Sequence, residues 1–352
     1  MTALRAHAGK IAVSLGLTAV LLYFFLSKID FVQTKKNLLA ASAGWLALSF
    51  ALGVMTFAFR AIRWTWILRP IAIVRFSPAF RATAAGFAAN NLPGKVGEVL
   101  RPALLARSEK LPFSPLLASV ALERVFDGAT VILFLLVAIW AKPSESLSLG
   151  LIGLVPAAVL AALVALTLFA VFRRAQTERF LEFFWRRLPA RLQPAVGGFA
   201  KTFVDGFASI KSPLLLLLIG AGSIGMWFVI NLQIYCTMRA VGVDLPLPAS
   251  YVVTAAAVLG LAVPTPGGLG SYQAAVQQAL TTIFAVNANS AGAVAILAWL
   301  SSFVLITLIG LGILAFSGRQ RALARSAEKL IETTDHGTAD AGRATELESG
   351  RK

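Results

Sequence analysis

The stretch VPTPGGLG at residues 263–270 interrupts one long apolar segment, and the stretch NNLPGKVGE at residues 90–98 interrupts another. Proline removes a backbone donor and glycine weakens a helix, so each segment must break at its Pro-Gly run. In lipid, such a break survives only where protein or a water-filled cavity covers its backbone polar groups. We therefore predict that residues 77–107 and 249–284 each form a re-entrant helical hairpin, which turns at the Pro-Gly run and returns to the side it came from.

The two hairpins belong to a repeated unit. An offset of 173 residues places the P-G-x-x-G run at 93–97 on the same run at 266–270. The same offset superposes the apolar crossings on either side of each hairpin. The sequence therefore predicts two copies of a crossing–hairpin–crossing unit, at about 44–141 and 217–314.

Composition places the whole unit in a membrane. Of the 352 residues, 58% are hydrophobic and 14% are charged, and the mean hydropathy is +0.78; a soluble domain carries about 25% charged residues. Core helices of a large soluble protein are the alternative, but they would need amphipathic faces, which these runs lack. Residues 1–316 are thus predicted to form an all-α polytopic membrane domain with about six full transmembrane helices plus two re-entrant helical hairpins. The crossings are predicted at 11–27, 44–62, 114–141, 147–172, 213–238 and 288–316.

Charge distribution predicts the orientation. Of the 32 Lys and Arg residues, 26 lie in segments on the side of the N-terminus and five on the other side, with one inside a crossing. The positive-inside rule then predicts cytoplasmic termini in a bacterial inner membrane, and makes the repeat an inverted one, as in many secondary transporters. The first crossing has no cleavage site and is predicted to be a retained signal anchor. Residues 173–212 are predicted to form a cytoplasmic amphipathic helix or a solvated loop helix, and residues 317–352 a largely disordered tail.

Several classes of function are not expected. The single cysteine, Cys236, excludes an intrachain disulfide and a cysteine cluster, and two histidines in opposite tails make a metal centre unexpected. There is no nucleotide-binding glycine loop. The basic excess orients the protein and contacts anionic lipid, so nucleic acid is not an expected partner. We expect no cofactor, no metal and no enzymatic activity.

Charged residues inside the apolar segments are the first candidate site. Glu98 and Arg101 lie one helical turn apart after the first break, and Glu123, Arg124 and Asp127 place an ionic face on the crossing at 114–141. Charges within a membrane cost at least about 2.5 kcal/mol each, so they are paired or line a polar cavity. Two interpretations stay open here: a structural ion-pair network, or the handling of a substrate or of protons.

The Pro-Gly turns are the second candidate. The return arms after Gly97 and Gly270 begin with free backbone N–H groups, which attract anions such as phosphate. Alternatively, the glycines only allow tight packing. The predicted substrate-binding or translocation residues are Asn90, Asn91, Pro93, Gly94, Lys95, Gly97, Glu98, Arg101, Glu123, Arg124, Asp127, Pro264, Pro266, Gly267, Gly268, Gly270 and Gln273.

Three runs, PGKVGEVLR at 93–101, ERVFD at 123–127 and PTPGGLG at 264–270, resemble the lysylphosphatidylglycerol synthase transmembrane (flippase-like) family. The likeness covers about residues 10–316. Two positions depart from it: Lys95 stands where Arg is expected, and Gln273 where Glu is expected.

The resemblance implies a stand-alone membrane module, without the aminoacyltransferase domain of two-domain members, that moves or presents lipids between leaflets. The implied substrate is a phospholipid, a polyprenyl-phosphate-linked lipid or a hopanoid-type lipid. Membrane lipids are the expected partners, and a lipid-modifying enzyme encoded nearby is a further one. The alternative is a non-catalytic scaffold or accessory subunit of a lipid-modifying or glycosyltransferase system.

Overall fold

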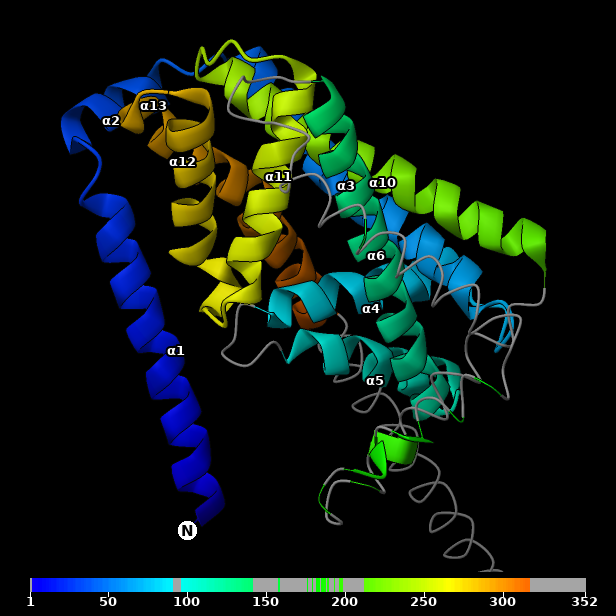
Figure 1. Cartoon of the computed structure of the whole chain (residues 1–352). Helices are drawn as coiled ribbons and strands as arrows, with labels where there is room; N and C mark the ends of the chain where they lie inside the picture. Colours follow the sequence, from blue (N-terminus) through cyan, green and yellow to red (C-terminus); the bar gives the residue numbers. More distant parts are fainter. Residues whose placement is uncertain are drawn as a thin grey trace, which may run out of the picture.

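The computed structural model describes residues 2–90, 96–141 and 212–316, with isolated residues between 158 and 198. Within these ranges all regular secondary structure is helical (Figure 1). The crossing predicted at 147–172, the amphipathic helix predicted within 173–212 and the predicted disordered tail fall almost entirely outside the described residues.

Four helices of the described chain are long and apolar enough to cross a membrane. A fifth crossing is provided if the first two helices, which meet at a bend of 84°, count as one broken span. The chain is therefore a multi-pass membrane protein, while the total of six crossings stays a prediction. The long helices are α3 (Ala43–Leu68), α6 (Phe113–Ala141), α10 (Pro213–Ala240) and the helix Ala288–Phe316, and the bent pair is α1 (Thr2–Leu26) with α2 (Phe31–Leu39).

The last long helix is not uniform. It begins as α13 (Ala288–Trp299), continues through a π-helical turn, η2 (Leu300–Val304), and then resumes α-helical geometry. A π-turn inside an α-helix is rare and is often found at a functional site.

Both segments with Pro-Gly runs are broken as predicted. The first consists of α4 (Phe76–Ala89) and α5 (Gly97–Glu109), which pack side by side. The second consists of α11 (Leu247–Ala262) and α12 (Ser271–Phe284), separated by the 3-10 turn η1 (Pro266–Gly268). Two helical hairpins are thus present, and their re-entry into a membrane stays a prediction.

The two hairpins close in the same way. A Cβ atom added to Gly86 would lie 3.0 Å from the Gly97 carbonyl oxygen and 2.7 Å from the Cβ of Arg101. A Cβ atom added to Gly260 would lie 2.6 Å from the carbonyl oxygen of Ser271 and 2.8 Å from the Cβ of Ala275. In each hairpin the partners are 11 and 15 residues further along the chain, which supports the predicted repeat. These arms match at an offset of 174, so the Pro-Gly run stands one residue earlier in the second hairpin.

Replacing Gly97 with alanine is expected to unfold the first hairpin. The new Cβ would collide with the Gly86 carbonyl oxygen, which belongs to a helix backbone and cannot move aside cheaply. Thermal unfolding of the purified protein, followed by size-exclusion chromatography, should show a large fall in the midpoint temperature. Gly225→Ala in α10 is the matched control, because nothing lies within 4 Å of its new Cβ and alanine favours a helix by about 1 kcal/mol over glycine. Equal midpoints for the two variants would contradict this packing.

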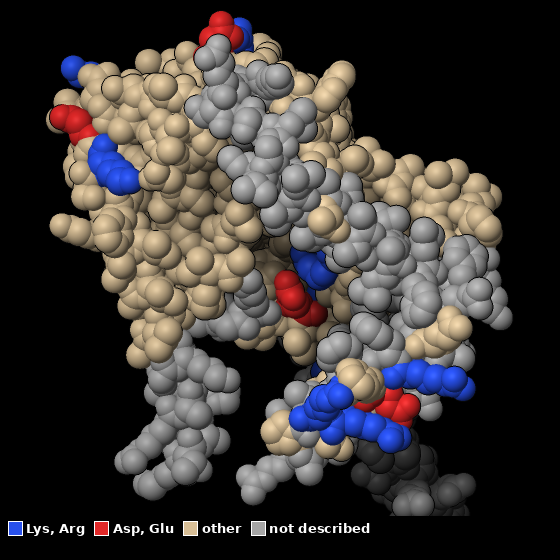
Figure 2. All heavy atoms as spheres, viewed as in Figure 1, with Lys and Arg blue, Asp and Glu red and all other residues tan. Residues whose placement is uncertain are grey.

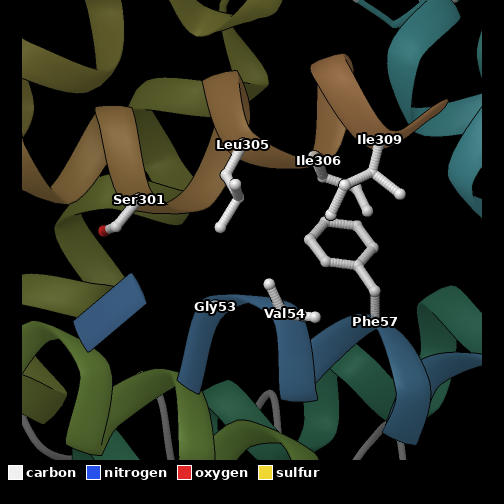
Figure 3. Close-up of a pocket in the computed structure, with 7 residues that line it drawn as sticks. All are labelled: Gly53, Val54, Phe57, Ser301, Leu305, Ile306 and Ile309. Atoms are coloured by element: carbon white, nitrogen blue, oxygen red, sulfur yellow. The ribbon is translucent and has the colours of Figure 1, made fainter. Parts of the chain in front are cut away.

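The two halves interlock through their long helices. α3 packs along α10 at the centre, α6 contacts α10 and α11, and η2 contacts α3 (Figure 1). Gly53 of α3 makes the last contact possible, since a Cβ there would lie 2.5 Å from the Ser301 carbonyl oxygen. Figure 3 shows the two helices facing each other, with Gly53 and Phe57 opposite Ser301 and Ile306.

Candidate functional site

The tips of the two hairpins touch. The backbone N–H of Gly267 donates to the carbonyl oxygen of Asn90 over 3.3 Å, and the Trp299 indole donates to the Gly267 carbonyl oxygen over 2.9 Å. Gly267 and Gly268 have φ angles of 57° and 70°, a region that favours glycine. The turn of the second hairpin therefore lies against the end of α4 in the first. Of the residues predicted at the first turn, Asn91, Pro93, Gly94 and Lys95 lie outside the described residues.

A cavity of about 410 Å³ opens beside these tips, between the two halves of the repeat. Its walls are formed by α3, α6, α10, η2 and both hairpins. Apolar side chains line it together with two groups of polar side chains. In Figure 2 acidic and basic side chains lie together in a hollow near the centre of the face. The polar and charged lining residues are Thr56, Arg60, Asn90, Glu98, Arg124, Asp127, Gln233, Thr254, Thr265, Tyr272 and Ser302.

Two buried carboxylates of α6 bind three buried arginines behind this hollow. Glu123 accepts hydrogen bonds from Arg60 and from Arg101, each at 2.8 Å, and forms an ion pair with Arg63 at 3.1 Å. Asp127 pairs with Arg63 at 2.7 Å and with Arg60 at 3.3 Å. The network therefore ties α3, α5 and α6 together, and three positive charges surround two negative ones.

Neutral groups complete this network. The Trp227 indole donates to Asp127 Oδ1 over 3.0 Å, and Arg63 donates to Ser223 over 2.8 Å. The Arg101 guanidinium lies 3.9 Å from the centre of the Trp64 ring, a cation–π contact. Through these contacts α10, in the second half of the protein, also touches the ionic cluster.

Arg60, Arg63 and Arg101 were counted among the basic residues on the side of the N-terminus, and the second crossing was predicted to end at residue 62. In the structure α3 continues to Leu68, and all three arginines are buried within the protein. Without these three arginines, the basic residues predicted on the side of the N-terminus still far outnumber the five on the other side. Arg60 and Arg63 are three residues apart, and Glu123 and Asp127 are four apart, so each pair lies on one face of its helix. This was the signal available in the sequence.

Arg124 and Glu98 form a different kind of pair. Each side chain is 41% exposed, both line the cavity, and Arg124 Nε lies 3.6 Å from Glu98 Oε1. A second contact, from Arg124 Nη1 to Asp127 Oδ2, is 3.4 Å long. Both distances exceed those of a strong charged hydrogen bond. Two arginines of the cluster line the cavity, Arg60 and Arg124, and Arg124 is the more exposed and the more loosely paired of the two.

Residues of the second hairpin mostly support the turn. Gln273 accepts from the backbone N–H of Gly270 over 2.7 Å and so caps the start of α12. The Pro264 carbonyl accepts from Ser14 of α1 over 2.6 Å, and Gly270 packs against the α1 backbone. Pro266 begins η1. Only Gly267 and Gly268 of the predicted second-hairpin residues line the cavity.

The structure thus separates the described site residues of the first half into three groups. Asn90, Glu98, Arg124 and Asp127 meet Gly267 and Gly268 around the cavity. Arg101 and Glu123 lie behind its wall, and Gly97 closes the first hairpin. The sequence reasoning missed the polar residues of the opposite wall, among them Gln233 and Thr254.

Similarity to known proteins agrees with this architecture. The chain is 25% identical over 348 residues to a UPF0104 membrane protein of Methanothermobacter thermautotrophicus, a match that spans 90% of this chain and 96% of the relative. Residues 11–310, which include every helix that lines the cavity, match the family described as lysylphosphatidylglycerol synthase TM region. The chain belongs to the lysylphosphatidylglycerol synthase TM region family.

Proposed function

We propose that this protein is a lipid translocator that takes the headgroup of an anionic or zwitterionic lipid into the cavity between its two halves. The observation that carries the proposal is Arg124, which is 41% exposed at the edge of a mostly buried ionic cluster and lines an open cavity of about 410 Å³. Pockets for small ligands commonly have volumes of about 300–1,000 Å³. The cavity therefore has room for a headgroup.

The charge balance favours a negatively charged group. Among the described residues of the cluster, four arginines (Arg60, Arg63, Arg101 and Arg124) face three carboxylates (Glu98, Glu123 and Asp127), which leaves one positive charge in excess. A phosphate can accept two parallel hydrogen bonds from a guanidinium. Phosphate binding would replace the long contacts of Arg124 with shorter ones and neutralise the excess.

The repeat supports movement of the bound lipid. In transporters with inverted repeats, the substrate lies where the halves meet, and one half rocks against the other. Here the tips of both hairpins contact each other beside the cavity through Asn90 and Gly267. The walls also include apolar side chains such as Val131, Ile230 and Leu261, which suit the part of a lipid next to its headgroup.

Leaflet exchange tests the proposal directly. The purified protein is reconstituted into liposomes that contain fluorescently labelled phosphatidylglycerol or phosphatidylcholine, and dithionite is added to bleach the outer leaflet. Exchange that is clearly faster than in protein-free vesicles is expected. Exchange no faster than in empty vesicles for either lipid would contradict translocation and would favour the scaffold or accessory role.

The predicted orientation is tested by labelling cysteines in a Cys236→Ala background. Asp244 lies in the turn between α10 and α11 and is 86% exposed on its side chain, so Asp244→Cys is expected to react with an impermeant thiol reagent added outside intact cells. Gln193→Cys, in the segment predicted to be cytoplasmic, should react only after the cells are permeabilised. The reverse pattern would overturn the proposed cytoplasmic termini.

A further inference from the structure

The part of the cavity wall that the second half of the repeat forms carries polar side chains but no charged ones. From it we propose a second subsite, formed by Gln233, Thr254, Tyr272 and Ser302, that binds the hydroxyl groups of a lipid headgroup. The ligand class is then a phosphodiester lipid whose headgroup carries an uncharged polyol or sugar. This inference rests on the proposed function in one respect only, namely that the cavity is where a headgroup binds.

The repeat shows how this wall relates to the ionic one. Gln233 of α10 stands 173 residues after Arg60 of α3, the offset that relates the two Pro-Gly runs. Arg60 binds the carboxylates of α6, whereas the Gln233 amide donates to Ser301 at 2.8 Å and to Ser302 at 2.9 Å on the corresponding long helix. The second half thus places an amide and hydroxyls where the first half has an arginine and carboxylates.

The π-helical turn produces this arrangement. Successive residues of a regular α-helix point about 100° apart, yet Ser301 and Ser302 both contact the same amide nitrogen of Gln233. Both serines lie in η2. The turn therefore directs the Ser302 hydroxyl, which lines the cavity, toward Gln233.

Thr254 is the observation that points to a ligand. It is only 4% exposed and lines the cavity, and its hydroxyl has no hydrogen-bond partner among the described residues. Five other buried helical threonines donate to the carbonyl oxygen four residues earlier, and these are Thr18, Thr56, Thr83, Thr130 and Thr237. Thr34 of α2 also lacks a partner among the described residues, but it does not line the cavity. A buried hydroxyl without a partner is unfavourable, so a hydroxyl of a bound headgroup would satisfy it.

The chemistry of this wall discriminates between headgroups. A cationic group, such as an aminoacyl ammonium, would face amide and hydroxyl groups there. The two carboxylates that line the cavity, Glu98 and Asp127, already bind arginines. A neutral hydroxyl can both donate and accept, which matches the residues present. The rings of Tyr272 and Phe303, 5.6 Å apart, add an aromatic surface on which a polyol or a sugar ring can pack.

The test measures binding rather than transport. Native mass spectrometry of the purified protein would give dissociation constants for four lipids with the same acyl chains: phosphatidylglycerol, phosphatidylinositol, phosphatidylethanol and lysyl-phosphatidylglycerol. Phosphatidylethanol keeps the single phosphodiester charge but has no hydroxyl group. We expect phosphatidylglycerol or phosphatidylinositol to bind about three- to tenfold more tightly than phosphatidylethanol, the range of a net neutral hydrogen bond. Whichever of phosphatidylglycerol and phosphatidylinositol binds more tightly shows whether the subsite prefers a glycerol or a sugar headgroup.

A threonine pair supplies the matched variants. Thr254→Val, which keeps the side-chain shape, should remove most of the preference for hydroxylated headgroups and leave phosphatidylethanol binding unchanged. Thr130→Val is the control, because the Thr130 hydroxyl already donates to Phe126 over 2.7 Å and does not line the cavity. The inference is overturned if phosphatidylethanol binds as tightly as phosphatidylglycerol, if lysyl-phosphatidylglycerol binds most tightly, or if Thr254→Val weakens all four lipids equally. If the protein prefers hydroxylated headgroups but shows no leaflet exchange, the proposed translocation is wrong and the proposed subsite is still supported.

Discussion

Replacing Glu123 with glutamine is expected to destabilise the protein severely. Glu123 is fully buried and binds Arg60, Arg63 and Arg101, so the change leaves three buried arginines with Asp127 as their remaining buried carboxylate. Breaking a buried pair by removing one partner costs about 3–5 kcal/mol. The yield of folded protein and the midpoint temperature of unfolding in detergent should both fall sharply.

An exposed acidic residue provides the control for this change. Asp244 pairs with Arg239 at the end of α10, and its side chain is 86% exposed. Exposed pairs contribute about 0–1 kcal/mol, so Asp244→Asn should leave the midpoint nearly unchanged. If Glu123→Gln unfolds at the same temperature as Asp244→Asn, the cluster does not stabilise the fold.

A double variant tests whether Arg101 and Glu123 interact directly. Arg101 binds Glu123 at 2.8 Å and stacks on Trp64, and methionine would retain much of that packing. Arg101→Met combined with Glu123→Gln removes one positive and one negative charge together. Because neighbouring residues of one network are not additive, the double variant should lose less stability than the sum of the two single variants. Strict additivity would show that these two side chains do not interact.

The sequence predicted the parts of the fold that lipid enforces. Long apolar runs must be helices in a bilayer, and a Pro-Gly run must break one, so the four long helices and the two hairpins followed from local sequence. The exact ends of helices were less predictable. An arginine near the end of a crossing is easily assigned to the following loop when the buried carboxylate that pairs with it is not known.

The ionic cluster shows this limit most clearly. Glu123 and Asp127 were evident as charges inside an apolar helix, but their partners Arg60 and Arg63 come from a helix some 60 residues earlier. Only tertiary packing pairs them. Gln273 shows the converse, since its placement beside the Pro-Gly turn suggested substrate contact, whereas it caps α12 through the Gly270 backbone.

The same comparison separates the two interpretations of the cluster. Glu123, Arg63 and Arg101 do not line the cavity, and they hold three helices together. Arg124 and Glu98 line it and are loosely paired. We therefore propose that the buried residues stabilise the fold and that Arg124 and Glu98 contact the substrate, and the next variants test this proposal.

Replacing Arg124 with glutamine is expected to abolish leaflet exchange without unfolding the protein. Its side chain is 41% exposed and its contacts with Glu98 and Asp127 are long, at 3.6 and 3.4 Å, so removing it leaves no fully buried charge unpaired. A hydrogen bond to a charged group contributes about 1.5–3 kcal/mol, which corresponds to a loss of roughly ten- to a hundredfold in headgroup affinity.

Matched variants decide whether this effect belongs to the site. Arg107→Gln is the control, because Arg107 is an exposed arginine of α5 outside the cavity lining, and it should exchange lipids at the wild-type rate. Glu98→Gln should have the opposite effect from Arg124→Gln, since it removes the carboxylate that competes with a phosphate for Arg124 and should tighten the binding of phosphatidylglycerol. Arg124→Lys keeps the charge but loses the fork of donors, so it should retain part of the exchange. Wild-type exchange by a folded Arg124→Gln protein would show that the headgroup does not bind Arg124, and the proposed site would then be wrong.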